Sequence, residues 1–169
     1  APRSSGQALA MRRAYEEAGY SPATLGLVEA HGTGTGAGDP TEFTSMKMLF
    51  PKGTFKDQYI GLGSVKSQVG HTKAAAGAAG MIKAALALHH KILPATINVT
   101  EPNSKFGIEE TPIYINTETR PWVRADYPRR AGVSAFGFGG VNVHFALEEH
   151  QAEHNAPYRL HNGNQGLIF

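Results

Sequence analysis

The amino-acid sequence predicts an α/β fold, in which helical and extended segments alternate along the chain before a final hairpin. Three observations carry this prediction. Apolar residues recur at helical spacing near the N-terminus, two short apolar runs (25–30 and 59–65) have the length of buried strands, and residues 130–148 form two extended stretches around a glycine-rich turn. The chain has 169 residues, of which 41% are hydrophobic and 18% charged. One globular domain with a hydrophobic core is therefore expected.

The first predicted element is a helix over residues 6–18. Its apolar side consists of Met11, Ala14, Tyr15 and Ala18. These positions follow the i, i+3, i+4, i+7 spacing of an amphipathic helix. Ser4 or Ser5 is placed to cap the start, and Gly19 is placed to end the helix. The apolar run 25–30 follows after a turn and indicates a buried strand.

The second helix is predicted over residues 41–50, after the glycine-rich loop 32–40. Asp39 is expected to cap it and Pro40 to occupy its first helical position. Its predicted apolar side consists of Phe43, Met46, Leu49 and Phe50. The run 59–65 then indicates a second short strand.

A long helix is predicted over residues 72–90, and it is apolar nearly all round except for Lys83. A helix of this kind is usually buried. Gly77 and Gly80 each cost ~1 kcal/mol relative to alanine in a helix interior, so close packing against another backbone is the expected compensation. Residues 93–106 indicate an irregular loop.

The last third of the chain predicts three more strands. They cover residues 112–116, 130–136 and 141–148, and the turn 137–140 joins the last two as a hairpin. Apolar residues alternate with other residues along 141–148, which is typical of a half-buried strand. From about residue 151 the sequence is polar and irregular, and it predicts a tail.

Composition excludes several classes of function. The net charge is +2 with no basic run, so a nucleic-acid partner is not expected. No apolar run reaches the length of about 18 residues that a transmembrane helix needs, and the N-terminus does not resemble a signal peptide. We therefore expect a cytoplasmic protein. The chain has no cysteine, which rules out disulfides, thiolate metal sites and a cysteine nucleophile within it.

Two blocks stand out as candidate functional segments, residues 29–42 and residues 66–71. Each delivers one histidine, His31 or His71, from an apolar run into a glycine-containing turn. Two imidazoles presented in this way indicate a shared reaction centre. Lys66 lies five residues before His71, and a nearby cation favours the neutral imidazole. The alternative is that each histidine is a structural residue.

The glycines of the 32–38 loop match neither the dinucleotide-binding nor the P-loop pattern. One interpretation is a plain flexible loop between a strand and a helix. The other is that glycine lets a ligand approach the backbone closely. Thr33 and Thr35 could then hydrogen-bond a polar, chain-like ligand.

Metal binding and serine hydrolysis are poorly supported. The chain has eight histidines but no H-E-x-x-H motif, and the spacing of Glu29 and His31 is poor for zinc. His89 and His90 are adjacent on a helix, so they point in different directions. Ser134 lacks the second glycine of the G-x-S-x-G motif. No metal site is expected.

The 137–140 turn is the third candidate segment. It is either an ordinary hairpin turn or a glycine-rich turn whose backbone N–H groups stabilise an oxyanion. Phe138 lies between glycines, where it would be a mobile aromatic at the mouth of a pocket.

Four blocks in order resemble one family. They are Gly6-Gln7-Ala8, residues 29–42, residues 63–77 and residues 131–142. Over residues 6–150 the sequence resembles the C-terminal half of a β-ketoacyl synthase domain. The resemblance implies a thiolase-like half domain: a mixed sheet with packed helices and a C-terminal hairpin, whose first strand is missing. It also implies a domain over residues 1–150 and a tail over 151–169.

The subtype resembles that of large multidomain synthases, because Gly80 stands where stand-alone fatty-acid ketosynthases usually carry glutamate. The segments 93–98 and 116–122 resemble polyunsaturated fatty-acid synthases and iterative polyketide synthases, and we favour the former. One departure is Val141, where threonine is usual.

The resemblance implies a decarboxylative Claisen condensation between a malonyl thioester and an acyl-cysteine. His31 and His71 correspond to the family's histidine pair, which stabilises the enolate as CO2 leaves. Lys66 corresponds to the lysine that orients the histidines. The backbone N–H of Phe138 corresponds to half of an oxyanion hole, and its side chain resembles the gate on the acyl pocket.

Further residues are assigned to substrate binding by the same resemblance. Thr33 and Thr35 correspond to the threonines that contact the pantetheine arm. Phe136, Gly139 and Asn142 belong to the last matching block and are also assigned to substrate binding. No cofactor is expected to bind directly, because the substrate is carried on the phosphopantetheine of an acyl carrier protein.

The absent cysteine is the main departure, since in the family it lies in the N-terminal half of the domain. We therefore expect this chain to be part of a longer polypeptide. The expected partners are an acyl carrier protein, the missing N-terminal half and, in the whole domain, a second copy. The alternative is a non-catalytic partner of the chain-length-factor type, although such partners usually lose the catalytic histidines.

Overall fold

The computed structural model describes residues 2–50, 53, 55, 57–137 and 139–151. Its helices are α1 (Ser4–Ala18), α2 (Gly38–Lys47), α3 (Lys66–Val69) and α4 (Ala76–His90). Four 3-10 turns accompany them: η1 (Pro22–Thr24), η2 (Lys73–Ala75), η3 (Ser104–Phe106) and η4 (Ile108–Glu110). The strands are β1 (Leu27–Glu29), β2 (Ile60–Gly63), β3 (Ile92–Leu93), β4 (Ile113–Ile115), β5 (Arg120–Pro121), β6 (Arg130–Phe136) and β7 (Asn142–Glu148). The α/β prediction is confirmed.

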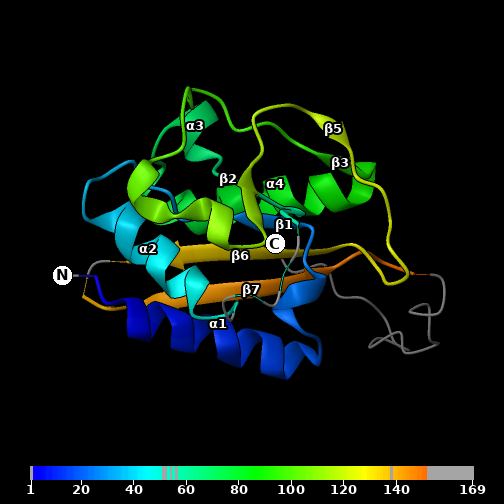
Figure 1. The fold of residues 1–169 in the computed structure, drawn as a ribbon, viewed down its shortest axis with the longest axis horizontal. Coiled ribbons are helices and arrows are strands. Elements are labelled where there is room, and N and C mark those ends of the chain that lie inside the picture. Colours follow the sequence, from blue (N-terminus) through cyan, green and yellow to red (C-terminus); the bar gives the residue numbers. More distant parts are fainter. Residues whose placement is uncertain (1, 51–52, 54, 56, 138, 152–169) are drawn as a thin grey trace, which may run out of the picture.

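A five-stranded sheet of order β4-β2-β1-β6-β7 forms the centre of the fold (Figure 1). The pairs β4–β2, β2–β1 and β1–β6 are parallel, whereas β7 runs antiparallel to β6. The predicted mixed sheet and C-terminal hairpin are both present. β3 and β5 form a separate two-stranded sheet.

Helices cover both faces of the large sheet, with α1 and α2 on one side and α4 on the other (Figure 1). The central strands β1 and β2 are therefore buried on both faces, which suits parallel strands. Val28 of β1 points into the core on the side of α1 and α2, whereas its neighbour Leu27 points into the core beside α4. This alternation along the strand divides the core into two layers.

The predicted caps of the first two helices are wrong. α1 begins at Ser4 itself and has no side-chain cap, so neither serine caps it. α2 begins at Gly38, one residue before Asp39, and the Asp39 carboxylate instead accepts the N–H of Gly34 at 3.1 Å. The aspartate thus closes the preceding loop. Gly19 does end α1, in the left-handed conformation with φ of 73°.

The prediction that the long helix is buried is wrong for one side of it. α4 packs closely on the sheet through its glycines, because a Cβ at Gly80 would lie 3.1 Å from Glu29 Cγ and one at Gly77 would lie 3.1 Å from Ala135 Cβ. On its outer side, Ile82 and Leu86 are 60% and 52% exposed. The apolar outer side covers no described part of this chain.

Burial near the start of β7 departs from the predicted alternation of buried apolar residues and exposed polar residues. Val141, just before the strand, is 62% exposed, whereas the polar His144 is buried against α1. Among the described strands, none pairs with the outer edge of β7. Except for Gln151, the predicted tail lies outside the described residues. Within the described part of the chain, no helix is both long and apolar enough to cross a membrane.

Candidate active site

The candidate site lies where parallel strands end. β1 leads into His31, β2 leads into Lys66, and β6 ends at Phe136. Parallel strands present their carboxyl ends at one edge of a sheet, and crevices form where neighbouring strands connect to opposite sides. β1 continues through α2 to β2 on one side, while β6 lies on its other side. The topology therefore brings together residues that are distant in sequence.

His31 is held through its backbone by a buried carboxylate, that of Glu42 in α2. The N–H groups of His31 and Gly32 each donate to one Glu42 oxygen at 2.8 Å. Burial raises the pKa of Glu42 to about 7, against the lowering effect of these two hydrogen bonds. The interaction fixes the turn that follows β1, in which Gly32 has a φ of 46°.

His71 follows α3 and faces His31. The two ring centroids are 5.7 Å apart and their planes are nearly perpendicular, at 88°. The backbone N–H of Lys73 donates to His71 Nδ1 at 3.0 Å. Lys73 has a left-handed backbone, with φ of 53°. In a neutral His71 ring the hydrogen must then reside on Nε2.

Lys66 contacts His31, not its sequence neighbour His71. Its Nζ donates to the His31 backbone oxygen and lies 3.5 Å from His31 Nδ1. Because an ammonium group only donates, His31 Nδ1 accepts and Nε2 carries the hydrogen. Burial lowers the pKa of His31 to about 4, with smaller contributions from Lys66 and His71. His31 is therefore neutral near pH 7.

The two histidines thus form a pair of donors, each with an Nε2–H group. Such a pair suits an oxygen atom that gains negative charge during a reaction. Lys66 also lowers the pKa of His31, although burial is the larger cause.

Phe136 lies beside this pair, with its ring centroid 5.9 Å from that of His31. Gly139 is exposed in the hairpin turn and has a φ of 86°. Asn142 faces α1, since a Cβ added to Gly6 would lie 3.1 Å from Asn142 Nδ2. Phe138 lies outside the described residues. Phe136 is therefore brought to the histidines, while Asn142 packs against a helix.

The threonine hydroxyls point toward the start of α2. Thr33 Oγ1 and Thr35 Oγ1 are 2.9 Å apart, and Thr35 Oγ1 accepts the N–H of Gly38 at 3.0 Å. A Cβ at Gly38 would lie 2.5 Å from Thr35 Oγ1 and 2.7 Å from Thr33 Oγ1. Both hydroxyls already make hydrogen bonds within the loop, and a ligand that contacts them would have to share or replace these hydrogen bonds.

Sequence reasoning did not assign roles to Glu42 and Lys73. Glu42 carried a usable signal, because it is a carboxylate on a helix face that otherwise packs into the core. Lys73 acts through its backbone, which leaves no signal in side-chain chemistry.

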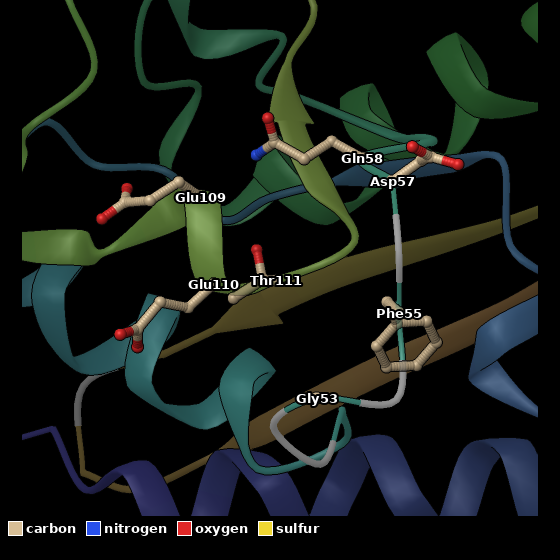
Figure 2. A pocket seen from close by; sticks show the side chains of 7 residues that line it. All are labelled: Gly53, Phe55, Asp57, Gln58, Glu109, Glu110 and Thr111. Carbon is tan, nitrogen blue, oxygen red and sulfur yellow. The ribbon is translucent and has the colours of Figure 1, made fainter.

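A separate cavity of about 330 Å³ lies near β4. It is lined by Gly53, Phe55, Asp57, Gln58, Glu109, Glu110 and Thr111. Figure 2 shows that the carboxyl groups of Glu109 and Glu110 point away from Asp57. In the described ranges, no cluster of three or more histidine, cysteine or acidic residues could hold a metal ion. The cavity includes neither His31 nor His71.

The fold and the site together define an α/β half domain of the ketosynthase type. Residues 1–100 match the family model "Beta-ketoacyl synthase, C-terminal domain", and residues 102–168 match "Ketoacyl-synthetase C-terminal extension". The chain belongs to the β-ketoacyl synthase family, whose members are transferases.

Relatives of this chain include synthases of two kinds. It is 50% identical to one of the polyunsaturated fatty acid synthase subunits of Thraustochytrium sp., over 99% of this chain and 6% of that protein. It is 47% identical to polyketide synthase PksL of Bacillus subtilis, over 90% of this chain and 3% of that protein. The chain thus spans only a small part of the curated relatives that it matches.

Solved structures of ketosynthases contain the same fold. The ketosynthase from module 6 of the bacillaene synthase of Bacillus subtilis superposes with a TM-score of 0.84 at 47% identity, over 89% of this chain and 27% of that one. Ketosynthase twelve of the bacillaene polyketide synthase of Bacillus amyloliquefaciens gives a TM-score of 0.85 at 38% identity, over 89% and 27%. This chain corresponds to about a quarter of those solved chains.

Proposed function

We propose that this chain, combined with a cysteine-bearing N-terminal ketosynthase half, catalyses decarboxylative condensation of a malonyl thioester with an acyl-cysteine. The observation that carries the proposal is the pair of facing Nε2–H donors on His31 and His71. An acyl carrier protein would deliver the malonyl group on its phosphopantetheine.

The two donors would bind the thioester carbonyl oxygen of the malonyl group. When the carbon–carbon bond to the carboxylate breaks, CO2 leaves and the bonding electrons form an enolate. Negative charge then grows on the oxygen between His31 and His71, so their hydrogen bonds strengthen in the transition state. The enolate carbon attacks the acyl thioester, and the cysteine thiolate leaves.

Lys66 keeps His31 in the tautomer that donates from Nε2. Its positive charge also opposes protonation of the His31 ring, so Nδ1 stays available as an acceptor. For the pantetheine arm we propose contacts with Thr33 and Thr35, and for the acyl chain a pocket beside Phe136.

The partner half would cover the exposed apolar side of α4. Ile82 and Leu86 are the largest exposed apolar residues of that helix, and the outer edge of β7, which pairs with no described strand, lies in the sheet that α4 covers. Isolated apolar side chains are common on surfaces, but an apolar helix side of this kind is typical of an interface. The double variant Ile82→Glu/Leu86→Glu should abolish co-purification with the N-terminal half.

The proposal is tested by supplying the N-terminal half of a closely related ketosynthase. Two quantities are measured separately: labelling of the partner's cysteine by a radioactive acyl thioester, and release of CO2 from malonyl carrier protein. His71→Ala should abolish CO2 release and leave acyl labelling intact. His89→Ala, an exposed histidine on α4, is the matched control.

Two outcomes would count against the proposal. Stable labelling of this chain alone would overturn it, because the chain has no cysteine. Equal CO2 release by the His71→Ala variant would favour the second candidate, a structural partner of the chain-length-factor type. The Nε2–H pair favours the enzyme over this alternative, since a structural partner does not need two matched donors.

A further inference from the structure

A buried ion pair lies directly behind the histidine site. Glu29 ends β1, two residues before His31, and its carboxylate is 2.8 Å from Lys83 Nζ of α4. The two side chains are 1% and 9% exposed. Neither Glu29 Oε2 nor Lys83 Nζ has another hydrogen-bond partner within the described part of the chain. A buried charge without its partner is strongly unfavourable, so each group depends on the other.

The packing of α4 is adapted to this pair. A Cβ at Gly80 would lie 3.1 Å from Glu29 Cγ, and a Cβ at Gly63 would lie 3.4 Å from Lys83 Nζ. Glycine at both positions leaves room for the carboxylate and the ammonium group. Lys83 is also the only lysine of α4, whose other residues up to Leu88 are glycine or apolar.

The second oxygen of Glu29 reaches the segment that carries Lys66. Glu29 Oε1 accepts the backbone N–H of Val65, the residue just before α3 and Lys66. One carboxylate therefore contacts the long helix and the start of the short helix at the same time.

Glu29 also has a second cation within electrostatic range. Burial is the largest influence on Lys66 and lowers its pKa, while the charges of Glu42, Glu29 and Asp39 act in the opposite direction. Lys66 nevertheless contacts His31 rather than either glutamate through a hydrogen bond. Another cation must therefore compensate the charge of Glu29, because Glu29 would otherwise attract Lys66.

We propose that Lys83 is a positioning residue of the ketosynthase site: by pairing with Glu29 it leaves Lys66 free to hold His31. The inference rests on the proposed roles of Lys66 and His31. Without Lys83, the buried carboxylate of Glu29 draws the Lys66 ammonium toward itself. Lys66 Nζ then leaves His31 Nδ1, and the Nε2–H tautomer of His31 is no longer held.

The test measures His31 directly, by NMR titration of its imidazole nitrogens in the full 169-residue chain. Four variants are compared with the parent: Lys83→Met, the double variant Glu29→Gln/Lys83→Met, Lys66→Met as the reference for complete loss, and Ala85→Gly. The last lies at an exposed position of α4 and weakens the helix without touching the pair, because glycine is a poorer helix former than alanine. It is the control for a merely structural effect. The groups whose charges act on the His31 ring are Lys66 and His71.

In Lys83→Met the pKa of His31 should rise as far as in Lys66→Met. In the double variant it should return to the parent's value, because glutamine still accepts the Val65 N–H but does not attract Lys66. Ala85→Gly should leave it unchanged. The proposal is overturned if Lys83→Met leaves the pKa of His31 unchanged, or if the folded double variant raises it as the single one does. A double variant that folds and raises the pKa of His31 overturns the proposal even if Lys83→Met does not fold.

Activity provides a second, separate readout in the chain combined with its N-terminal half. Lys83→Met should lower kcat for CO2 release by about tenfold, a change of about 1.4 kcal/mol, with KM unchanged. The double variant should restore kcat. If the NMR result holds but the parent releases no CO2, the proposed function fails while the ion-pair role stands. If the parent releases CO2 but Lys83→Met does not change the pKa of His31, the proposed function stands and the ion-pair role fails.

Discussion

The stability of this chain should depend on pH through one buried histidine, His144. Its ring links the sheet to α1, because Nδ1 lies 3.0 Å from Ser134 Oγ and Nε2 lies 2.6 Å from Tyr15 Oη. Burial lowers the pKa of His144 from 6.5 to about 4. The unfolded chain, in which the ring is solvated, regains the ordinary value.

This difference in pKa between the folded and the unfolded chain determines how stability changes with pH. As the pH falls below 6.5, the unfolded chain binds a proton before the folded chain does, so stability is lost progressively down to about pH 4. The loss from His144 is close to zero at about pH 7.5 and reaches about 2.5 kcal/mol at about pH 4.5. His31, whose pKa is also lowered to about 4, adds a loss of the same sign. Glu42 has the opposite sign, because its pKa is raised to about 7 in the folded chain. A comparison with a His144 variant is therefore needed to isolate the effect.

Urea unfolding of the parent chain and His144→Gln, at about pH 7.5 and about pH 4.5, measures this difference. At the higher pH the variant should be less stable by about 1–2 kcal/mol, because a buried hydrogen bond is lost. At the lower pH that gap should shift by about 2.5 kcal/mol in favour of the variant. An equal gap at both pH values would refute the reasoning. NMR titration of His144 in the parent provides a second check that does not require the variant to fold.

Three further predictions concern packing and charge. Gly132→Ala should destabilise the chain by about 1–3 kcal/mol, since its Cβ would lie 2.2 Å from Tyr15 Oη. In a Tyr15→Phe background, which lacks that hydroxyl, denaturant unfolding should show that Gly132→Ala costs less stability than in the parent. If the two substitutions have additive effects on stability, the contact is contradicted. The stability of Glu42→Gln relative to the parent should increase by about 2 kcal/mol when the pH is raised from about 5.5 to about 8.5. The reason is that only the parent must bury a charged carboxylate as the pH rises through about 7. A constant difference in urea unfolding would contradict this. Lys66→Met should raise the pKa of His31 above about 4, measured by NMR, and an unchanged value would show that burial alone lowers it.

Local patterns predicted the elements more reliably than their ends. The strand 130–136 was predicted with the bounds that the structure has, because its hydrophobic run is bounded by charged residues on one side and glycine on the other. Helix starts were less accurate. Asp39 had the side chain of an N-cap, but the loop glycine Gly34 supplies its hydrogen-bond donor, and no local pattern reveals that competition.

The candidate site was partly visible in the sequence. His31, His71 and Lys66 belong to distinct motifs, and their residue types and resemblance to a family sufficed to select them. Their pairing was not visible. Proximity in sequence suggested that Lys66 acts on His71, whereas its ammonium group contacts His31, 35 positions earlier in the chain.

Residue types and periodicity by themselves thus determined the α/β class, the two histidine blocks and the absence of a cysteine. The tertiary structure decided which groups meet. Parallel order in the sheet brings the ends of β1 and β2 side by side, so Glu42, Lys66 and Lys73 each fix one part of the histidine pair through contacts that span the loops. Tautomers and shifted pKa values depend on burial and on neighbours within a few ångströms, and these are properties of the folded chain.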